Sequence, residues 1–493
     1  MNINKIVFFS YGDYTTAIQQ YRIIGPLKEA GIEIVKGIDN GEFKPMLIQD
    51  CDIVLIQRDF AKAFEDFQTI SWMAKSTQKP LVLDLDDAIL SSPEEHPDRI
   101  TSYYAASLPG VLHAVIDADL VTVSTENLKK ELLGLNPNIE VLPNFLDTNL
   151  WNFKTQPSNE NDNLVKILYM GSATHQPEIE LMSEALVRVA KESRKKIEFI
   201  FVGVQPPEKL REVAEVTSIN DMSYVYKNFV DRFSEIKADF AIAPLSDNPF
   251  NRAKSPIKYL EYSVNGIPGV YSTIEPYSTV IRDGYNGLLA KSERQWFAQI
   301  MRLIEDQELR ESIVRNSQQN IKNHYLLEKN ASRWREVYEG IQERKPKAKV
   351  IEKESILSNL SSVAHQIAEL VDNYESKNAQ LNNQIQEYAI EKEQLLEHHQ
   401  NERDRLEMAI ENLCQERDDF IQQKNTLTKK KEDFVQQKNT LTREIEKLTS
   451  EKESLLAANQ GLQDRVTALK EKNKEREEEL YQLAWSLKSA KAE

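Results

Sequence analysis

Phe250–Ala290 reads FNRAKSPIKYLEYSVNGIPGVYSTIEPYSTVIRDGYNGLLA, and it follows closely on the short apolar run Phe240–Ala243 (FAIA). The run predicts a buried parallel strand, and the residues from Ser255 onward predict a helix. A Gly-Ile-Pro tripeptide at residues 266–268 ends that helix and leads into a second apolar run, Gly269–Ser272. A strand, a helix and another strand in this order predict a βαβ unit, although plain α/β packing without a ligand is the alternative.

The same alternation extends toward the N-terminus. Amphipathic stretches such as Ala17–Ala30 and Thr125–Leu135 separate apolar runs, and the polar segment Lys154–Asn163 interrupts the pattern once. We therefore expect an α/β chain with two Rossmann-like domains, at residues 1–155 and 163–344, facing a ligand-binding cleft. The strand-like runs are Lys5–Ser10, Asp52–Gln57, Pro80–Leu85, Leu120–Ser124 and Glu140–Pro143, then Lys166–Met170, Ile197–Gly203 and Ser223–Tyr226.

The chain changes character after a basic, proline-containing hinge at residues 345–354. An apolar residue recurs every seventh position from Phe420 to Leu469, which predicts a long α-helical coiled coil over residues 355–490. Polar residues at many of the facing positions favour a parallel homodimer, and a solvated single helix is the alternative. As one continuous helix the segment would be on the order of 200 Å long.

Composition excludes several classes of protein. The 493 residues are 40% hydrophobic and 28% charged with a net charge of -16, so we expect no nucleic-acid partner. Cys51 and Cys414 are far apart and lack ligand-type neighbours, which argues against a disulfide scaffold or a metal site. No apolar run is long enough for a signal peptide or a transmembrane segment. We expect a cytoplasmic protein that is at most peripheral at the inner face of the cell membrane.

One helix face in the opening stretch predicts an anion site. Ser255, Lys258 and Glu261 lie three residues apart at the start of the helix. A helix N-terminus offers unsatisfied N–H groups and the positive end of its dipole to a phosphate. Lys254 and Lys258 add the charge that a diphosphate requires. Glu261, one turn deeper, is placed to accept hydrogen bonds from a ribose diol.

The motifs K-S-P-x-K-x-L-E-Y, N-G-I-P-G-V and D-G-Y-N-G-L-L together resemble the C-terminal half of the family-4 (group 1) retaining glycosyltransferases, over roughly residues 160–340. The resemblance implies a GT-B fold, a nucleotide diphosphate sugar as donor, and no metal or other cofactor. In that family Ser255 and Lys258 would hold the donor pyrophosphate and Glu261 the ribose. Ala253 replaces a second glutamate of the family pattern, which leaves Lys254 and Asn251 as candidates to face the sugar.

The loop after Lys166–Met170 is a second candidate donor-binding element. Gly171 and Ser172 form a turn at which backbone N–H groups can approach an anion. The family often places basic residues soon after this glycine, whereas here neither Lys nor Arg follows until Arg188. We expect His175 or Lys254 to supply the missing charge, and a structural role is the alternative for His175.

Acidic residues follow a strand of the first domain. Asp86 and Asp87 come after Pro80–Leu85, and clustered carboxylates there can bind a metal, although the implied fold does not normally need one. We predict Asp86 on the acceptor side of the cleft together with Gly12 and Asp13. Helix capping is the alternative for the two aspartates.

The predicted reaction is transfer of a sugar from a nucleotide diphosphate sugar to an acceptor hydroxyl, with Lys254, Asp87 and His175 nearest the reacting atoms. The expected pathway is bacterial surface polysaccharide (O-antigen or capsule) synthesis, with a saccharide or lipid-linked saccharide acceptor. The coiled coil would form a homodimer or space the enzyme from a partner enzyme of polysaccharide assembly. A sugar-nucleotide epimerase and a non-catalytic scaffold that tethers partners are the alternatives.

Overall fold

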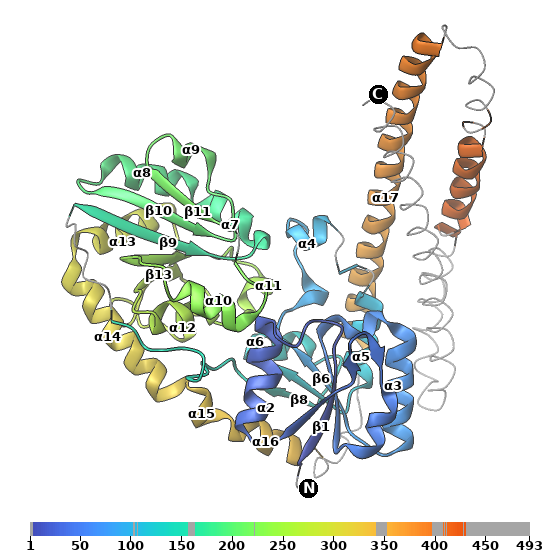
Figure 1. Cartoon of the computed structure of the whole chain (residues 1–493), viewed down its shortest axis with the longest axis horizontal. Helices are drawn as coiled ribbons and strands as arrows, with labels where there is room; N and C mark the ends of the chain where they lie inside the picture. Colours follow the sequence, from blue (N-terminus) through green and yellow to red (C-terminus); the bar gives the residue numbers. More distant parts are fainter. Residues whose placement is uncertain are drawn as a thin grey trace. The chain divides into compact units, whose positions relative to one another are not determined.

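The computed structural model describes residues 3–101, 104–105, 107–155, 163–220, 222–341, 353–396, 408, 410, 412–426 and 428–429 (Figure 1). The chain divides into two compact units, Met1–Ile367 and Ala368–Glu493. The first unit contains two six-stranded sheets in which every strand pair is parallel. The α/β class and the two Rossmann-like sheets predicted from the sequence are therefore confirmed.

The first sheet has the strand order β2-β1-β5-β6-β7-β8. Its strands are β1 (Lys5–Phe9), β2 (Glu33–Lys36), β5 (Ile53–Gln57), β6 (Leu81–Leu85), β7 (Leu120–Val123) and β8 (Ile139–Val141). The connecting elements include α1 (Ala17–Gln19), η1 (Gln20–Ile24), α2 (Gly25–Glu29), η3 (Arg58–Lys62), α3 (Phe64–Ser76), η4 (Ile89–Ser91), α4 (Pro97–Ile100), α5 (Leu108–Asp117) and α6 (Glu126–Leu132).

Both faces of this sheet are covered, which explains why its strands are continuous apolar runs. One face packs against α3 and α5, with Val54, Ile56 and Leu83 among its buried residues. The opposite face packs against α2 and against the distant helix α16 (Ser332–Glu339). Trp334 of α16 is fully buried there and its indole N–H donates to the carbonyl of Arg22 at 3.2 Å. The chain thus returns to the first domain after it has built the second sheet.

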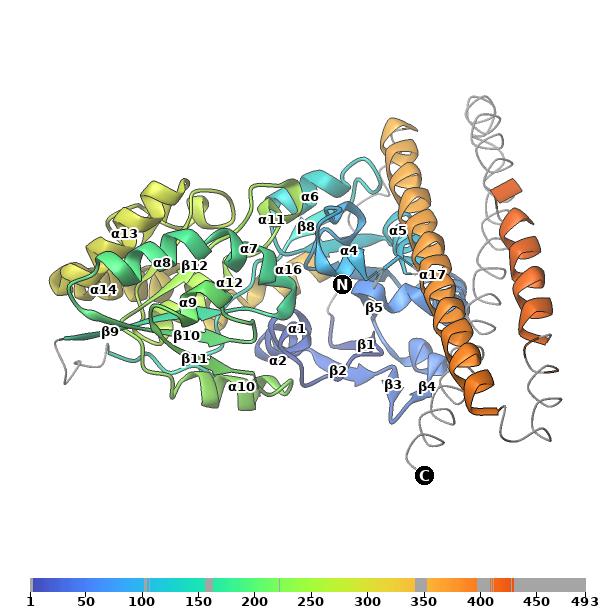
Figure 2. The ribbon, with the colours of Figure 1, turned by 90° about the horizontal axis from the view of Figure 1, so that it is seen from above.

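The second sheet has the order β11-β10-β9-β12-β13-β14, with β9 (Leu164–Met170), β10 (Lys196–Val202), β11 (Glu215–Ile219), β12 (Phe240–Ala243), β13 (Gly269–Ser272) and β14 (Leu288–Ala290). Helices α8 (Ser183–Glu192) and α13 (Glu293–Glu305) cover one face, and α10 (Tyr226–Phe233) and α12 (Ile257–Val264) cover the other (Figure 2). The remaining helices are α7 (Gln176–Leu181), α9 (Glu208–Arg211), α11 (Pro249–Arg252), α14 (Gln307–His324) and α15 (Leu327–Asn330). Successive strands are added on one side of β9 as far as β11 and on its other side from β12 onward. Such a switch in strand order opens a crevice beyond the carboxyl ends of the strands.

One predicted strand is wrong. The segment Ser223–Tyr226 is not a strand; Tyr226 instead begins α10, whose Val230 and Phe233 pack under the sheet. The edge strand is β11, which precedes it and has only exposed and half-buried residues. An edge strand with so little buried surface carries little hydrophobic signal, which explains why the prediction fell on the wrong residues.

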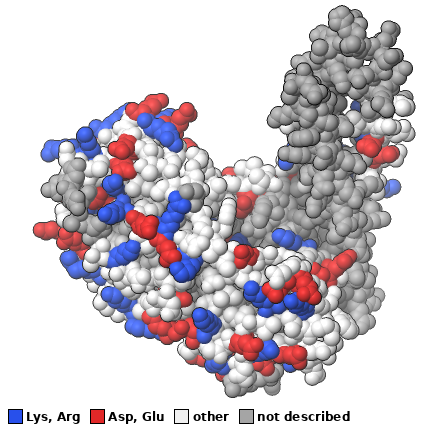
Figure 3. Space-filling model, viewed as in Figure 1, with Lys and Arg blue, Asp and Glu red and all other residues white. Residues whose placement is uncertain are grey.

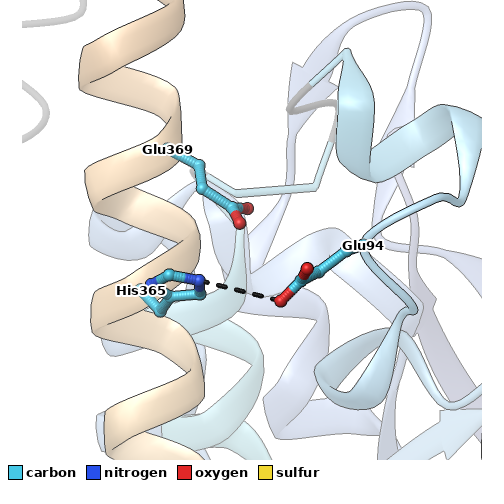
Figure 4. Close-up of side chains that lie close together, drawn as sticks. All are labelled: Glu94, His365 and Glu369. Atoms are coloured by element: carbon cyan, nitrogen blue, oxygen red, sulfur yellow. Dashed lines mark ion pairs between the residues drawn. The ribbon is translucent and has the colours of Figure 1, made fainter.

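Helix α17 (Lys353–Leu396) begins against the first domain. Val363 is buried in the core of that domain, and Leu360 and Ile367 pack beside it. Ser362 donates to the carbonyl of Leu90 at 3.3 Å, and His365 Nε2 lies 3.9 Å from Glu94 Oε1 (Figure 4). The first turns of the predicted coiled coil therefore belong to the globular unit, whereas residues 345–352 of the predicted hinge lie outside the described residues.

Within the second unit, residues 412–426 form a helix, and Lys424 Nζ lies 2.9 Å from Glu375 Oε2 of α17. A straight helix rising ~1.5 Å per residue would separate these residues by on the order of 70 Å. The prediction of one continuous rod is therefore wrong. The heptad positions from residue 430 onward lie outside the described residues, so the parallel dimer stays a prediction.

Among the residues described, we find no helix with both the length and the apolar character needed to cross a bilayer. On the face drawn in Figure 3, acidic and basic side chains of the described residues are interspersed.

Candidate functional site

The switch in strand order between β9 and β12 brings together most of the polar residues singled out in the sequence. The loop after β9 carries Gly171, Ser172 and His175, and α7 follows it directly. The loop after β12 contains α11 and leads into α12. Loops at such a switch point form the usual ligand crevice of a doubly wound sheet.

Lys258 is the most unusual residue of this crevice. It lies in the first turn of α12, it is only 8% exposed, and among the described residues its Nζ has no hydrogen-bond partner. Its ammonium lies 5.1 Å from the centre of the Tyr169 ring. Burial lowers the pKa of Lys258 to about 7. A buried cation without a partner is costly, so its retention points to an anionic ligand.

Ser255 is fixed by a chain of hydrogen bonds that begins in the first domain. Asp84 and Arg22 form a fully buried ion pair of 2.8 Å, to which Thr122 adds a hydrogen bond of 2.7 Å. Arg22 Nη1 donates to Asn144 Oδ1 at 3.0 Å, and Asn144 Nδ2 donates to Ser255 Oγ at 2.8 Å. The hydroxyl next to the α12 N-terminus is thus oriented by a network anchored in the other sheet.

Glu261 lies one turn below Lys258 and is also buried. Burial raises the pKa of Glu261 to about 8, so its carboxyl group is largely protonated at neutral pH. Tyr21 Oη donates to Glu261 Oε1 at 3.3 Å, which links η1 of the first domain to α12. The spacing of Ser255, Lys258 and Glu261 predicted one helical face. Lys258 and Glu261 lie in α12 as predicted, whereas Ser255 precedes the helix, which begins at Ile257.

The surroundings of His175 disfavour its charged form. Burial and the neighbouring Lys258 lower the pKa of His175 to about 3, so the imidazole is neutral at neutral pH. Its Nδ1 lies 3.8 Å from Glu178 Oε2, which is too long for a hydrogen bond. Desolvation and Lys258 thus disfavour the imidazolium, and a charged role for His175 toward a diphosphate stays a prediction.

Asn251 does not stand free in the crevice. Its Nδ2 donates to Glu178 Oε1 and to the carbonyl of Ser246, both at 3.0 Å. Asn251 therefore joins the loop after β12 to α7. Glu178, which the sequence analysis passed over, is the carboxylate that receives this hydrogen bond and is 7% exposed.

The two glycines at the ends of β9 and β10 pack against each other. A Cβ atom on Gly203, whose φ is +78°, would lie 2.3 Å from the carbonyl oxygen of Gly171. The predicted turn at Gly171 thus depends on close backbone packing. Ser172 is exposed, and its hydroxyl shares a hydrogen bond of 2.6 Å with that of Thr174.

Asp86 and Asp87 lie with Arg58 at the carboxyl edge of the first sheet. Arg58 Nε is 3.2 Å from Asp86 Oδ1, and its Nη2 is 3.4 Å from Asp87 Oδ2. Lys254 Nζ lies 3.7 Å from Asp87 Oδ1. Burial raises the pKa of Asp86 to about 6, whereas Lys254 and Arg58 outweigh burial and lower the pKa of Asp87. Asp87 and Lys254 are thus brought together, as expected for residues facing one cleft.

Gly12 and Asp13 have local contacts. Asp13 is exposed, and its Oδ1 accepts from the backbone N–H and hydroxyl of Thr15, both at 2.8 Å. The Thr15 carbonyl accepts from the backbone N–H of Tyr226 at 2.8 Å. This loop therefore contacts α10 of the second domain, and the Asp13 carboxylate is already used in capping its own turn.

Ala253 belongs to the hydrophobic core of the first domain. Its side chain is fully buried in the core of the first domain together with Phe250, and its carbonyl accepts from the Thr125 hydroxyl at 2.7 Å. A glutamate here would be enclosed by apolar groups. Position 253 therefore serves the contact between the two domains.

Residues 152–320 match the family described as "Glycosyl transferases group 1". The second domain is a group 1 glycosyltransferase domain. Two parallel α/β domains, one of them of this family, make the fold of the first unit GT-B-like. A search of curated proteins gave no match.

Solved structures similar to the chain include TarM, HepE and a sucrose-phosphate synthase. TarM is 13% identical, with 58% of this chain and 54% of TarM covered and a TM-score of 0.43. HepE of Anabaena, in complex with UDP and glucose, is 14% identical. The match covers 68% of this chain and 100% of HepE, with a TM-score of 0.48. Sucrose-phosphate synthase of Thermosynechococcus elongatus is 12% identical. The match covers 69% of this chain and 100% of the synthase, with a TM-score of 0.49. The chain thus spans about half of TarM.

Proposed function

We propose that the chain is a glycosyltransferase that moves a sugar from a nucleoside diphosphate sugar to an acceptor hydroxyl. The observation that carries the proposal is Lys258, a buried ammonium without a partner at the N-terminus of α12 in a group 1 glycosyltransferase domain. A leaving diphosphate needs fixed positive charge in a site that excludes water. Lys258 and the α12 N-terminus supply that charge.

The other candidate residues take supporting roles in this proposal. Ser255 donates its hydroxyl to a diphosphate oxygen, and neutral Glu261 hydrogen-bonds the ribose. Lys254 Nζ lies 3.7 Å from Asp87 Oδ1, and in this proposal it neutralises charge at the point where the two substrates meet. Asp87 and Asp86 face the acceptor, while Gly171 and Ser172 offer backbone N–H groups. His175 and Asn251 hold the pocket wall, and Gly12 and Asp13 belong to the loop after β1, which contacts α10.

The finer parts of the proposal rest on the motif resemblance. We propose retention of the anomeric configuration, and a saccharide or lipid-linked saccharide acceptor in bacterial surface polysaccharide synthesis. The domains would comprise residues 1–155 and 163–344, and the enzyme would work in the cytoplasm or at the inner face of the cell membrane. No metal or other cofactor enters this scheme, because lysines and a helix N-terminus provide the electrostatic stabilisation.

We also propose self-association through the heptad segment, with a partner enzyme of polysaccharide assembly as a further ligand. Lys424 lies against Glu375, so association would involve a folded-back pair of helices. Sedimentation equilibrium of the full chain should give a dimer. A chain ending at residue 367 should be monomeric, and a monomeric full chain would contradict the proposal.

Calorimetric titration of the full chain with UDP, GDP, dTDP and CMP, and with their sugar derivatives, tests the donor site. We expect one nucleoside diphosphate to bind. Lys258→Ala should weaken binding of that nucleotide by about 10- to 100-fold, the usual effect of losing a charge-assisted hydrogen bond. Lys237→Ala, a change at an exposed lysine of the same domain, should leave the affinity unchanged. Failure of every nucleotide to bind would favour the non-catalytic scaffold.

A further inference from the structure

Glu178 is a buried carboxylate on the donor side of the crevice that the family motif does not contain. It lies in the first turn of α7, directly after the loop that follows β9. Its side chain is 7% exposed. Burying a carboxylate is costly unless its oxygens are hydrogen-bonded, so a residue of this kind needs an explanation.

The hydrogen bond from Asn251 Nδ2 to Glu178 Oε1 bridges the switch point of the sheet. Glu178 belongs to the β9 side, and Asn251 belongs to the β12 side. The carboxylate is therefore held at the crevice where a doubly wound sheet binds its ligand. Its negative charge also raises the pKa of Lys258, so it lies within electrostatic reach of the unpartnered ammonium.

Glu178 Oε2 retains capacity to accept further hydrogen bonds. A carboxylate offers about four acceptor sites, and His175 Nδ1 at 3.8 Å is too distant to fill one. A diphosphate would be repelled by this carboxylate, whereas sugar hydroxyl groups are donors that match it. The chemistry of the group therefore selects the sugar part of a donor over its phosphate part.

Position 253, where the family motif has a glutamate, is closed to substrate. Ala253 is 0% exposed and lies in the core of the first domain. At this edge of the second domain, the buried carboxyl groups among the described residues are Glu178 and Glu261. Since Glu261 is linked to Tyr21 one turn below Lys258, the sugar position is left to Glu178.

We propose that Glu178 accepts hydrogen bonds from hydroxyl groups of the donor sugar and replaces the carboxylate missing at Ala253. The inference rests on the proposed function, because it assumes a nucleoside diphosphate sugar in the crevice. Asn251 acts as a positioning residue that orients the carboxylate. The donor sugar would thus be held by a carboxylate from α7.

The test compares binding of a nucleoside diphosphate with binding of the corresponding nucleotide sugar, using the nucleotide that the full chain binds. Glu178→Gln should weaken binding of the nucleotide sugar by about 10- to 100-fold, because a hydrogen bond to a charged group is lost. The same variant should bind the plain diphosphate as well as the wild type or more tightly, because a negative charge is removed. Glu178→Asp should recover part of the sugar affinity.

Glu180→Gln, a change at an exposed residue of the same helix, is the matched control and should alter neither affinity. Thermal unfolding of each variant checks that α7 remains folded. The inference would be overturned if Glu178→Gln bound the nucleotide sugar with unchanged affinity. It would also be overturned if the folded variant lost affinity for the diphosphate and the nucleotide sugar equally. Both outcomes would leave the proposed donor site intact. A wild-type chain that binds no nucleotide would overturn both the inference and the proposed function.

Discussion

At the scale of single residues, the crevice is defined by groups whose usual protonation is altered. Lys258 and Glu261 lie one turn apart, and burial moves their pKa values in opposite directions, to about 7 and about 8. Near neutral pH the lysine is partly neutral and the glutamic acid is mostly protonated. Binding an anion therefore requires Lys258 to take up a proton, which makes ligand binding depend on pH.

We predict that nucleoside diphosphate affinity falls as the pH rises. Below about pH 7 Lys258 is charged and Glu261 is neutral, and both states favour an anion. Above about pH 8 the lysine is neutral and the glutamate is charged, and both oppose it. Isothermal titration in buffers of different ionisation enthalpy should show proton uptake near neutral pH. Affinity that is constant or rises between about pH 6 and about pH 9 would contradict this assignment.

The residues that sequence reasoning missed share one property, which is that their partners are distant in sequence. Asn144 and Ser255 are 111 positions apart, and Tyr21 and Glu261 are 240 apart. Helical spacing could predict that Lys258 and Glu261 lie together because they share one helix, and Ser255 directly precedes that helix. It could not predict Asn144, Tyr21 or Glu178, whose roles arise only when two sheets or two loops meet.

At the scale of elements, central strands were predictable and edge strands were not. Strands β5, β6 and β12 are buried along their whole length, so each reads as an apolar run. Strand β11 lies at an edge with no buried residue, and the apolar residues that follow it belong to α10. The first turns of α17 were also misassigned, because an apolar heptad position and a core contact look alike in sequence.

The docking of α17 gives a stability prediction. Val363→Asp should lower the free energy of unfolding of the first unit by about 2–4 kcal/mol, because it buries an unpaired charge in an apolar core. Ser361→Asp, at an exposed position of the same helix, is the control and should change little. Urea unfolding followed by tryptophan fluorescence measures both. Equal stability of the two variants would show that α17 does not contribute to this core.

At the scale of the whole molecule, the second unit contains neighbouring helical segments in place of a continuous rod. Spin labels at Ser376→Cys and Gln422→Cys, in a chain with Cys414→Ser, should be less than about 30 Å apart, because packed helices lie about 10 Å apart. A single helix would separate them by on the order of 70 Å. Dilution with unlabelled protein distinguishes a contact within one chain from a contact between chains. A distance of on the order of 70 Å between the two labels, unchanged on dilution, would show instead that the segment is one continuous helix.

The proposed function of the GT-B-like unit depends most on the binding of a diphosphate by the buried Lys258. The most direct measurement is the ratio of the dissociation constants of a nucleoside monophosphate and the matching diphosphate for the full chain, in the wild type and in Lys258→Ala. We predict that the wild type prefers the diphosphate by about tenfold or more, and that the variant loses this preference. Equal affinity of the wild type for both nucleotides, or a preference that persists in Lys258→Ala, would contradict the account.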